Sequence, residues 1–314
     1  MASAPLSAEQ HRTVQLLLQL APQEGYNLTP LDHLRLLRSN RPLSRTPVLY
    51  EPGIVIVCQG RKRGVLGDQV YVYDAQHYLV VSVALPFSME TEASAEEPLL
   101  ALYLRLDFNV AAELMLALDA LSGMPTAAPR SMVSTPLDAP LINSVLRLLE
   151  ALASPIEATL LGPALVREIY LRVMLGEQGG AMRAALTLHG QFGKIGRAIS
   201  LIHQRFAEDL GVAQLASYAG MSVPTFHAHF KAVTDNSPMQ YLKSIRLHQA
   251  RLLMARNGLT AGAASAQVGY ESASQFGREF KRLFGRSPVQ EVTRMKQNFA
   301  LPDPHPDSEF VSSH

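Results

Sequence analysis

Residues 212 to 291 contain one sequence pattern twice, and this repeat restricts the fold more than any other feature of the chain. Three residues recur 50 positions later: Phe226, Phe230 and Lys231 are repeated as Phe276, Phe280 and Lys281. Ser237-Pro238-Met239-Gln240 recurs at the same distance as Ser287-Pro288-Val289-Gln290. Gly220 and Gly269 are 49 residues apart, so one turn holds an extra residue. A match at a fixed period indicates one supersecondary unit used twice.

Each copy predicts two short helices joined by a turn. In the first copy, Val212–Tyr218 is an amphipathic helix that ends at Gly220, because glycine accepts the left-handed conformation at helix ends. Ser222 is positioned to cap the next helix, with Pro224 in its first turn. The apolar stripe of that helix consists of Phe226, Phe230 and Val233, and the second copy has Phe276, Phe280 and Leu283. This is the pattern of a helix-turn-helix motif, whose second helix enters the major groove of DNA.

The side of each second helix opposite the apolar stripe is called the outer face here. A helix turns by about 100° per residue, which gives the residues on or beside that face: Thr225, His227, Ala228 and Lys231 in the first copy, and Ser274, Gln275, Arg278, Lys281 and Arg282 in the second. Arginine suits guanine, glutamine suits adenine and lysine suits phosphate. These nine residues are therefore the predicted DNA-binding residues.

Between the copies, Pro238 to Arg256 predicts one long helix. At 1.5 Å per residue this helix is about 27 Å long. That length suits two recognition helices placed about one DNA turn, roughly 34 Å, apart.

These residues resemble the DNA-binding domain of the AraC/XylS family of bacterial transcription regulators over about a hundred residues. The matching residues include Gly220-Met221-Ser222, Phe230-Lys231, Ser237-Pro238, Arg246 to Leu253, Val268-Gly269-Tyr270, Ser274-Gln275-Phe276, Arg278 to Lys281 and Phe284 to Pro288. Relatives often carry arginine where this chain has Ala228, which predicts weaker base recognition by the first unit. The resemblance implies double-stranded DNA and RNA polymerase as partners, an unknown small-molecule effector, activation more often than repression, and some dimerisation.

Charge divides the chain into two parts. Residues 192 to 300 hold 14 Lys and Arg against 6 Asp and Glu, a net charge of +8, whereas residues 1 to 191 hold 14 against 18, a net charge of −4. A basic half beside an acidic half predicts that only one half binds nucleic acid. We expect an α+β multidomain chain with an N-terminal sensing or dimerisation domain (1–190), an all-α DNA-binding domain (191–298, with helix-turn-helix units at 212–233 and 260–284) and a disordered tail (299–314).

Between Val48 and Leu106 the chain predicts short strands separated by turns at Gly60, Gly64 and Gly67-Asp68. Relatives carry a cupin-like β-barrel here, with flanking helices. The runs Gln59 to Gly64, Tyr73-Asp74 and His77 to Val81 resemble one N-terminal subfamily of these regulators. The short basic run Arg61-Lys62-Arg63 is interpreted as an exposed hairpin rather than as an anion-binding site.

Cofactors and metals are not expected in this domain. His77 is the only histidine between His33 and His189, so the His-x-His set of metal-binding cupins is missing. His77 is expected to form a hydrogen bond in the core or at the rim. The single cysteine, Cys58, lies in an apolar run and is expected to be buried.

Helices are expected around the strands. Their ranges are residues 7–20, 109–121, 139–152 and 160–175, and residues 28–39 form another short structured element. The helices 139–152 and 160–175 either pack on the barrel or form a dimer seam. Gly176 to Gly180 and Gly190 to Gly193 mark the domain boundary, and Gly196–Phe206 begins the DNA-binding domain.

Without a signal peptide or an apolar run of about 20 residues, the chain is expected in the bacterial cytoplasm, at the nucleoid and not in a membrane.

Three other hypotheses remain open at this point. In the first, the chain is a plain helical bundle and the repeat is incidental. In the second, the first half is a cupin-type enzyme fused to a helical domain. In the third, the chain is an architectural DNA-bending protein without sequence specificity. An enzyme requires convergent ligands or acid–base pairs, and residues 48 to 106 offer none with a recognisable spacing. We therefore expect no catalytic residues.

Overall fold

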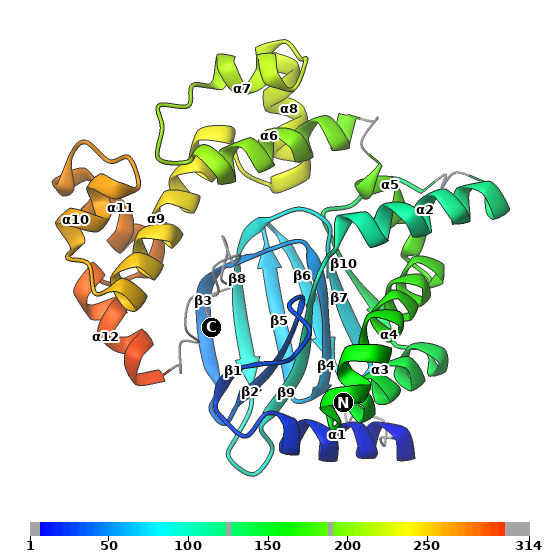
Figure 1. Cartoon of the computed structure of the whole chain (residues 1–314). Helices are drawn as coiled ribbons and strands as arrows, with labels where there is room; N and C mark the ends of the chain where they lie inside the picture. Colours follow the sequence, from blue (N-terminus) through cyan, green and yellow to red (C-terminus); the bar gives the residue numbers. More distant parts are fainter. Residues whose placement is uncertain (1–6, 124–126, 188–190, 299–314) are drawn as a thin grey trace.

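The computed structural model describes residues 7–123, 127–187 and 191–298. Its first half contains a curled antiparallel sheet of ten strands in the order β1-β2-β9-β4-β7-β6-β5-β8-β3, with β10 paired to β7 (Figure 1). The strands are β1 (Gly25–Leu28), β2 (Leu34–Ser39), β3 (Leu43–Tyr50), β4 (Gly53–Gln59), β5 (Arg61–Leu66), β6 (Gln69–Asp74), β7 (His77–Val81), β8 (Leu85–Glu92), β9 (Leu99–Arg105) and β10 (Met132–Pro136). The curled sheet confirms the cupin-like prediction, although β1 and β3 end the strand order without pairing to each other.

Both faces of the central strands are buried. In β4, Val55 and Val57 point into the curl of the sheet, whereas Ile54, Ile56 and Cys58 belong to the core on the opposite face. Side chains alternate between the faces of a strand, so a strand buried on both sides is a continuous apolar run. The prediction that Cys58 is buried is confirmed, and burial raises the pKa of its thiol to about 12.

The expectation of an exposed hairpin at Arg61-Lys62-Arg63 is wrong. These residues lie within β5, and Lys62 is almost fully buried. Its Nζ donates a hydrogen bond to Tyr50 Oη at 3.1 Å, and burial lowers the pKa of the amine to about 7. Gly64 is not a turn either, because β5 continues through it to Leu66.

Helices cover the outer face of the sheet. They are α1 (Ala8–Leu20), α2 (Phe108–Ser122), α3 (Ala139–Leu152), α4 (Pro155–Leu175) and α5 (Gly179–Leu186). The apolar sides of α1, α3 and α4 form one core with the outward side chains of β4, β7 and β9 (Figure 1). Of the two open alternatives for α3 and α4, packing on the sheet is therefore observed. Residues 28–39, expected as one element, contain the whole of β2 but only Leu28 of its hairpin partner β1. Helix α5 replaces part of the expected boundary loop.

The second half is entirely helical in its described residues. Its helices are α6 (Gln191–Arg205), α7 (Val212–Tyr218), α8 (Val223–Thr234), α9 (Pro238–Asn257), α10 (Ala261–Gln267), α11 (Ala273–Phe284) and α12 (Pro288–Asn298). The repeated Ser-Pro pair begins a helix in both copies, since α12 starts 50 residues after α9 and both follow a capping serine. This repeat is visible in the sequence, whereas the helix α12 was not predicted from it. The expected disordered tail lies outside the described residues.

Helix α9 lies along the sheet and joins the two halves. Tyr241 Oη donates a hydrogen bond to the carbonyl of Ala84 at 2.7 Å. Ten residues further along α9, Arg251 Nη1 reaches the carbonyl of Pro47 at 3.4 Å and forms a buried ion pair with Glu291 at 3.2 Å. The helix that links the two helix-turn-helix units is thus held against the sheet near both of its ends.

Candidate nucleic-acid interface

The two helix-turn-helix units are built by the same local interactions. Gly220 and Gly269 turn the chain with φ of +62° and +85°, a conformation that glycine adopts without strain. Ser222 accepts a hydrogen bond from the backbone N–H of Thr225 at 3.4 Å, and Ser272 accepts one from Gln275 at 3.2 Å. These caps satisfy N–H groups at the starts of α8 and α11 and fix where the two helices begin.

The apolar stripes of α8 and α11 are buried. The buried stripe residues are Phe226, Phe230 and Val233 in α8 and Phe276, Phe280 and Phe284 in α11. Leu283, expected on the inward stripe, is only half-buried, because Phe284 occupies the deep position beside Phe280, with ring centroids 4.5 Å apart.

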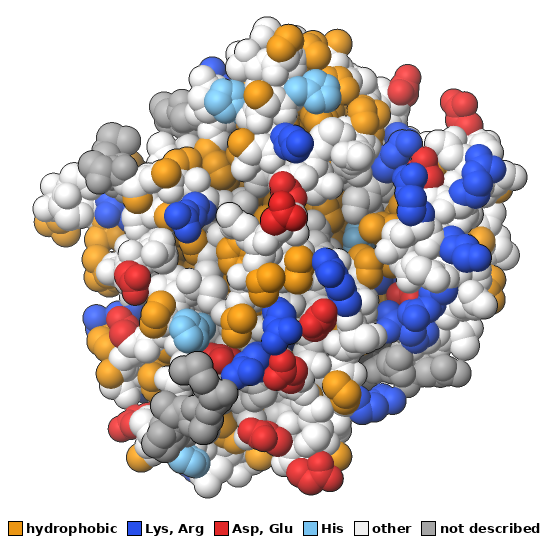
Figure 2. All heavy atoms as spheres, turned by 180° about the vertical axis from the view of Figure 1, so that it is seen from behind, with side chains coloured by type: hydrophobic (Ala, Val, Ile, Leu, Met, Phe, Trp, Pro, Cys, Tyr) orange, Lys and Arg blue, Asp and Glu red, His pale blue; other side chains and the backbone are white. Residues whose placement is uncertain are grey.

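All nine predicted DNA-binding residues are exposed. They are Thr225, His227, Ala228 and Lys231 on α8, and Ser274, Gln275, Arg278, Lys281 and Arg282 on α11. Among the described residues, His227, Lys231, Arg278 and Lys281 form no salt bridge. Figure 2 shows Lys and Arg side chains gathered over the end of the molecule that holds α10, α11 and α12. The structure therefore leaves these cationic side chains available to an external anion.

Two of the nine side chains have partners within the domain. The hydroxyl of Thr225 lies 2.8 Å from that of Ser222, and Gln275 Nε2 donates a hydrogen bond to Glu279 Oε1 at 3.2 Å. Arg278 and Lys281 are therefore freer to contact DNA than Gln275.

Glu279 is the centre of a polar cluster on α11. It accepts hydrogen bonds from Lys243 Nζ at 2.8 Å and from Tyr270 Oη at 2.7 Å. Burial raises the pKa of Glu279, but the hydrogen bonds from Lys243, Tyr270 and Gln275 outweigh this effect and hold the pKa below its ordinary value. The charged carboxylate thus connects α11 to α9 and to the turn before α11.

Arg246 fixes the second unit relative to the first. From α9, its guanidinium donates hydrogen bonds to three carbonyls: Phe206 at 2.7 Å, Glu208 at 2.8 Å and Gly269 at 3.0 Å. Two of these carbonyls precede α7 and the third belongs to the turn between α10 and α11. The sequence assigned no role to Arg246, since its three partners are backbone atoms that side-chain patterns do not reveal.

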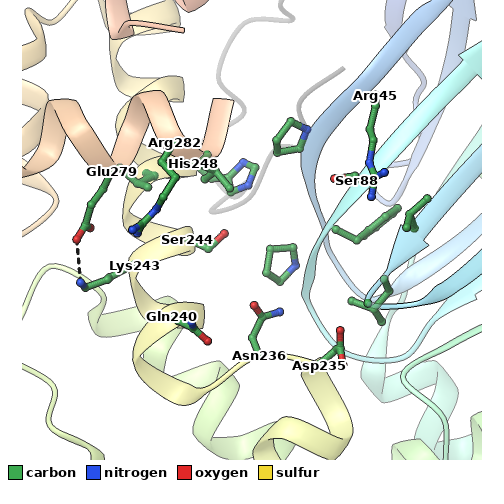
Figure 3. A pocket seen from close by; sticks show the side chains of 18 residues that line it. Arg45, Ser88, Asp235, Asn236, Gln240, Lys243, Ser244, His248, Glu279 and Arg282 are labelled. Atoms are coloured by element: carbon green, nitrogen blue, oxygen red, sulfur yellow. Dashed lines mark hydrogen bonds and ion pairs between the residues drawn. The ribbon is translucent and has the colours of Figure 1, made fainter. Parts of the chain in front are cut away.

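Arg282 also lines a cavity between α9, α11 and the sheet, so it faces both solvent and the first half of the chain (Figure 3).

In the first half of the chain, the described residues contain no group of three or more His, Cys, Asp and Glu arranged to hold a metal. His77 is half-buried and its Nδ1 lies 3.1 Å from Asp74 Oδ1, in agreement with the expected hydrogen bond in the core or at the rim. In the described ranges, no helix is long and apolar enough to cross a membrane.

Comparisons with known proteins agree with this division. Residues 30–181 match the family model for the AraC-type transcriptional regulator N-terminus, and residues 215–294 match a helix-turn-helix domain model. The probable transcriptional regulator LumQ of Photobacterium leiognathi is 33% identical over 89 residues, which cover 28% of this chain and 36% of LumQ. The transcriptional activator RclR of Escherichia coli K12, described as RCS-specific, is 35% identical over 86 residues, 27% of this chain and 30% of RclR. The matched segment thus spans about a third of these relatives' length.

Solved structures extend the likeness to both halves. ToxT from Vibrio cholerae, bound to a methylnaphthalenyl-butenoic acid, superposes with a TM-score of 0.59 at 10% identity over 82% of this chain and 98% of ToxT. ToxT bound to an unsaturated fatty acid gives a TM-score of 0.58 at 12% identity over 86% and 98%. At this identity the likeness establishes a shared fold.

Proposed function

Because this chain belongs to the AraC family of transcription regulators, we propose that it regulates transcription by binding specific DNA sequences through α8 and α11. The observation that carries the proposal is the pair of exposed outer faces, 50 residues apart in sequence and joined by a single helix. At 20 residues, α9 is about 30 Å long, which suits two adjacent major grooves on one side of a duplex.

Selection of bound sequences from a random pool of duplexes tests this function. We expect enrichment of a site with two half-sites whose centres are about 10 base pairs apart. Footprinting on that site is expected to protect two successive major grooves. An architectural protein would enrich no sequence, and that result would contradict the proposal.

We further propose that a small-molecule effector acts on the first half of the chain. We also propose that the regulator is an activator, which acts through RNA polymerase, and not a repressor. An effector changes DNA affinity only by its differential affinity for two states of the protein, typically by about 1–3 kcal/mol. Such a protein would work at the nucleoid in the cytoplasm. Reporter transcription from the selected site, measured with and without the protein, tests the sign of regulation.

A homodimer is the proposed oligomer. Helices α2 and α4 leave large apolar side chains exposed, namely Phe108, Leu116, Leu121, Ile156, Leu160 and Leu161. Exposed apolar side chains concentrated on two neighbouring helices are typical of a surface that associates. Sedimentation equilibrium is expected to give twice the chain mass, and Leu160→Glu is expected to return it to one chain mass.

A further inference from the structure

Gln275 is the third residue of α11, and Glu279, one helical turn further along, holds its side-chain amide. Nε2 of Gln275 donates a hydrogen bond to Oε1 of Glu279 at 3.2 Å. Gln275 is nonetheless exposed, and the residues near the start of a recognition helix are those that contact base edges. The amide of Gln275 therefore keeps polar atoms for DNA although one of its N–H groups is bonded within the helix.

The carboxylate of Glu279 is itself fixed from two other elements. Lys243 Nζ, from α9, bonds to the same oxygen as Gln275 at 2.8 Å (Figure 3). Tyr270 Oη donates to the other oxygen at 2.7 Å. The side chain of Glu279 is only 12% exposed. Glu279 is thus a rigid acceptor beside the exposed Gln275, and its charge is offset by Lys243.

The first helix-turn-helix unit folds without this pair. Fifty residues earlier, on α8, Thr225 and His229 occupy the places of Gln275 and Glu279. The hydroxyl of Thr225 instead lies 2.8 Å from that of the capping Ser222. Both units nevertheless have the same serine cap and the same pair of buried phenylalanines. The Gln–Glu pair is therefore not required by the motif, and it distinguishes the surface that the second unit presents to DNA.

The bond to Glu279 changes which base the amide of Gln275 can recognise. A glutamine amide has two N–H protons and one oxygen. In the major groove adenine presents one acceptor and one donor, N7 and the N6 amine, whereas guanine presents two acceptors, N7 and O6. With one N–H bonded to Glu279, the amide offers one N–H and one oxygen, which match adenine. A guanine in the same place would receive one hydrogen bond, and its O6 would face the amide oxygen.

We propose that Glu279 is a positioning residue that restricts Gln275 to adenine, because it holds one N–H of the amide away from the base edge. Without Glu279 the amide is free to rotate and to direct both N–H groups at guanine. The role of Glu279 is therefore to reject guanine at one base pair of the half-site bound by α11. The inference deepens the proposed sequence-specific DNA binding and rests on it, since Gln275 must contact a base.

The test measures binding of the full chain to two operators that differ at one base pair, A·T or G·C. That pair is the one at which Gln275→Ala removes the preference for adenine. We expect the wild type to prefer adenine about tenfold. Glu279→Met keeps the length of the side chain and is expected to lower this preference several-fold, mainly through tighter binding of the guanine operator. Glu279→Ala is a second variant with the same expectation, and circular dichroism checks that both are folded.

Three controls separate positioning from structural support. Tyr270→Phe removes the hydrogen bond to the other oxygen and is expected to lower stability while the ratio of the two affinities stays the same. Glu271→Ala removes the same charge from an exposed place before α11 and is also expected to leave the ratio unchanged. In a Gln275→Ala background, Glu279→Met is expected to have no effect on the ratio, because no amide remains to be positioned.

Three results would overturn the role of Glu279. They are an unchanged ratio in folded Glu279→Met and Glu279→Ala, an equal change in the Gln275→Ala background, and an equal change in Tyr270→Phe. A chain that selects no DNA site would overturn the proposed function as well. A chain that selects a site but gives one of the three results overturns this inference alone.

Discussion

Arg278 is the residue on which base recognition by the second unit is predicted to depend. Its exposed guanidinium has no salt-bridge partner among the described residues, and it can donate to O6 and N7 of one guanine. Arg278→Ala is expected to remove about 1–3 kcal/mol of discrimination at one or two base pairs of a single half-site. The measurement is binding of the variant to a panel of operators with single base changes.

Lys281→Ala is the control for Arg278→Ala. A lysine that contacts phosphate contributes equally to every sequence, so this variant is expected to weaken all operators alike. If Arg278→Ala had the same uniform effect, Arg278 would be a phosphate contact and the assignment of the outer face would be wrong.

Lys62 makes stability depend on pH. Its amine has a pKa of about 7 in the folded chain, against 10.5 for the ordinary side chain. Between these values the unfolded chain binds a proton that the folded chain lacks, so the free energy of unfolding rises with pH from about 7 to about 10. Below pH 7 the amine is charged in both states and the folded chain carries the full cost of burying that charge.

Lys62→Met removes this titration. Relative to the wild type, the variant is expected to be more stable at pH 6.5, and its advantage is expected to shrink by a few kcal/mol, to order of magnitude, by pH 9.5. Urea unfolding at the two pH values measures the difference. Arg63→Met, which alters the exposed neighbour in β5, is expected to leave the wild-type pH dependence unchanged, and an unchanged dependence in Lys62→Met would contradict the argument.

At the scale of elements, Arg246 is expected to hold the two helix-turn-helix units in register. Its three hydrogen bonds join α9 to the loop before α7 and to the turn at Gly269. Arg246→Met is therefore expected to weaken binding to a site with both half-sites about tenfold or more, while each isolated half-site loses less. Titrations with the full site and with each half-site check this. Arg256→Met on the same helix is the comparison variant, and equal losses on all three DNAs would argue against a register role.

The elements that the sequence predicted well are those whose signal is local. Glycine at the turns, serine at the cap and phenylalanine at i and i+4 gave α7 at its observed limits and α8 within one residue of them, and the second unit was expected to end at 284, where α11 ends. The start of α12 was available from the same repeat, since Ser287-Pro288 copies Ser237-Pro238, but the prediction did not extend that far. The burial of Lys62 could also have been predicted from the sequence. Side chains alternate between the two faces of β5, so Lys62 lies on the face opposite to Arg61 and Arg63.

Contacts between segments that are far apart in the chain could not be predicted from the sequence. The strand β10 (Met132–Pro136) is short and follows a proline-containing linker, and only its antiparallel pairing with β7 defines it. The packing of α9 on the sheet depends on hydrogen bonds to the carbonyls of Ala84 and Pro47, more than 150 residues away. A single sequence carries no pairing information of this kind. For the same reason, the sequence did not predict that Arg282 lines the cavity between α11 and the sheet, although it predicted that Arg282 is exposed.

For the whole molecule, the division of charge predicts how DNA affinity responds to salt. Residues 192 to 300 carry a net charge of +8 and residues 1 to 191 carry −4. Each phosphate neutralised releases counterions, and the logarithm of the binding constant falls by about 0.9 per phosphate for each tenfold rise in salt. We expect a fragment of residues 190–300 to fold on its own core and bind DNA with a steep salt dependence. At low salt it should bind nonspecific DNA more tightly than the full chain, whose acidic half repels the duplex.

The comparison that decides this is the affinity of the fragment and of the full chain for one nonspecific duplex between about 50 and 200 mM salt. The fragment is expected to lose affinity in proportion to several phosphate contacts, and a fragment of residues 1–187 is expected not to bind at all. Folding of the DNA-binding fragment is checked by circular dichroism, because removing the sheet exposes Tyr241 and Arg251, which it buries in the full chain. If the folded fragment bound with an affinity independent of salt, the positive charge of α8 and α11 would not be what attracts DNA. The assignment of Lys231 and Lys281 as phosphate contacts would then fail with it.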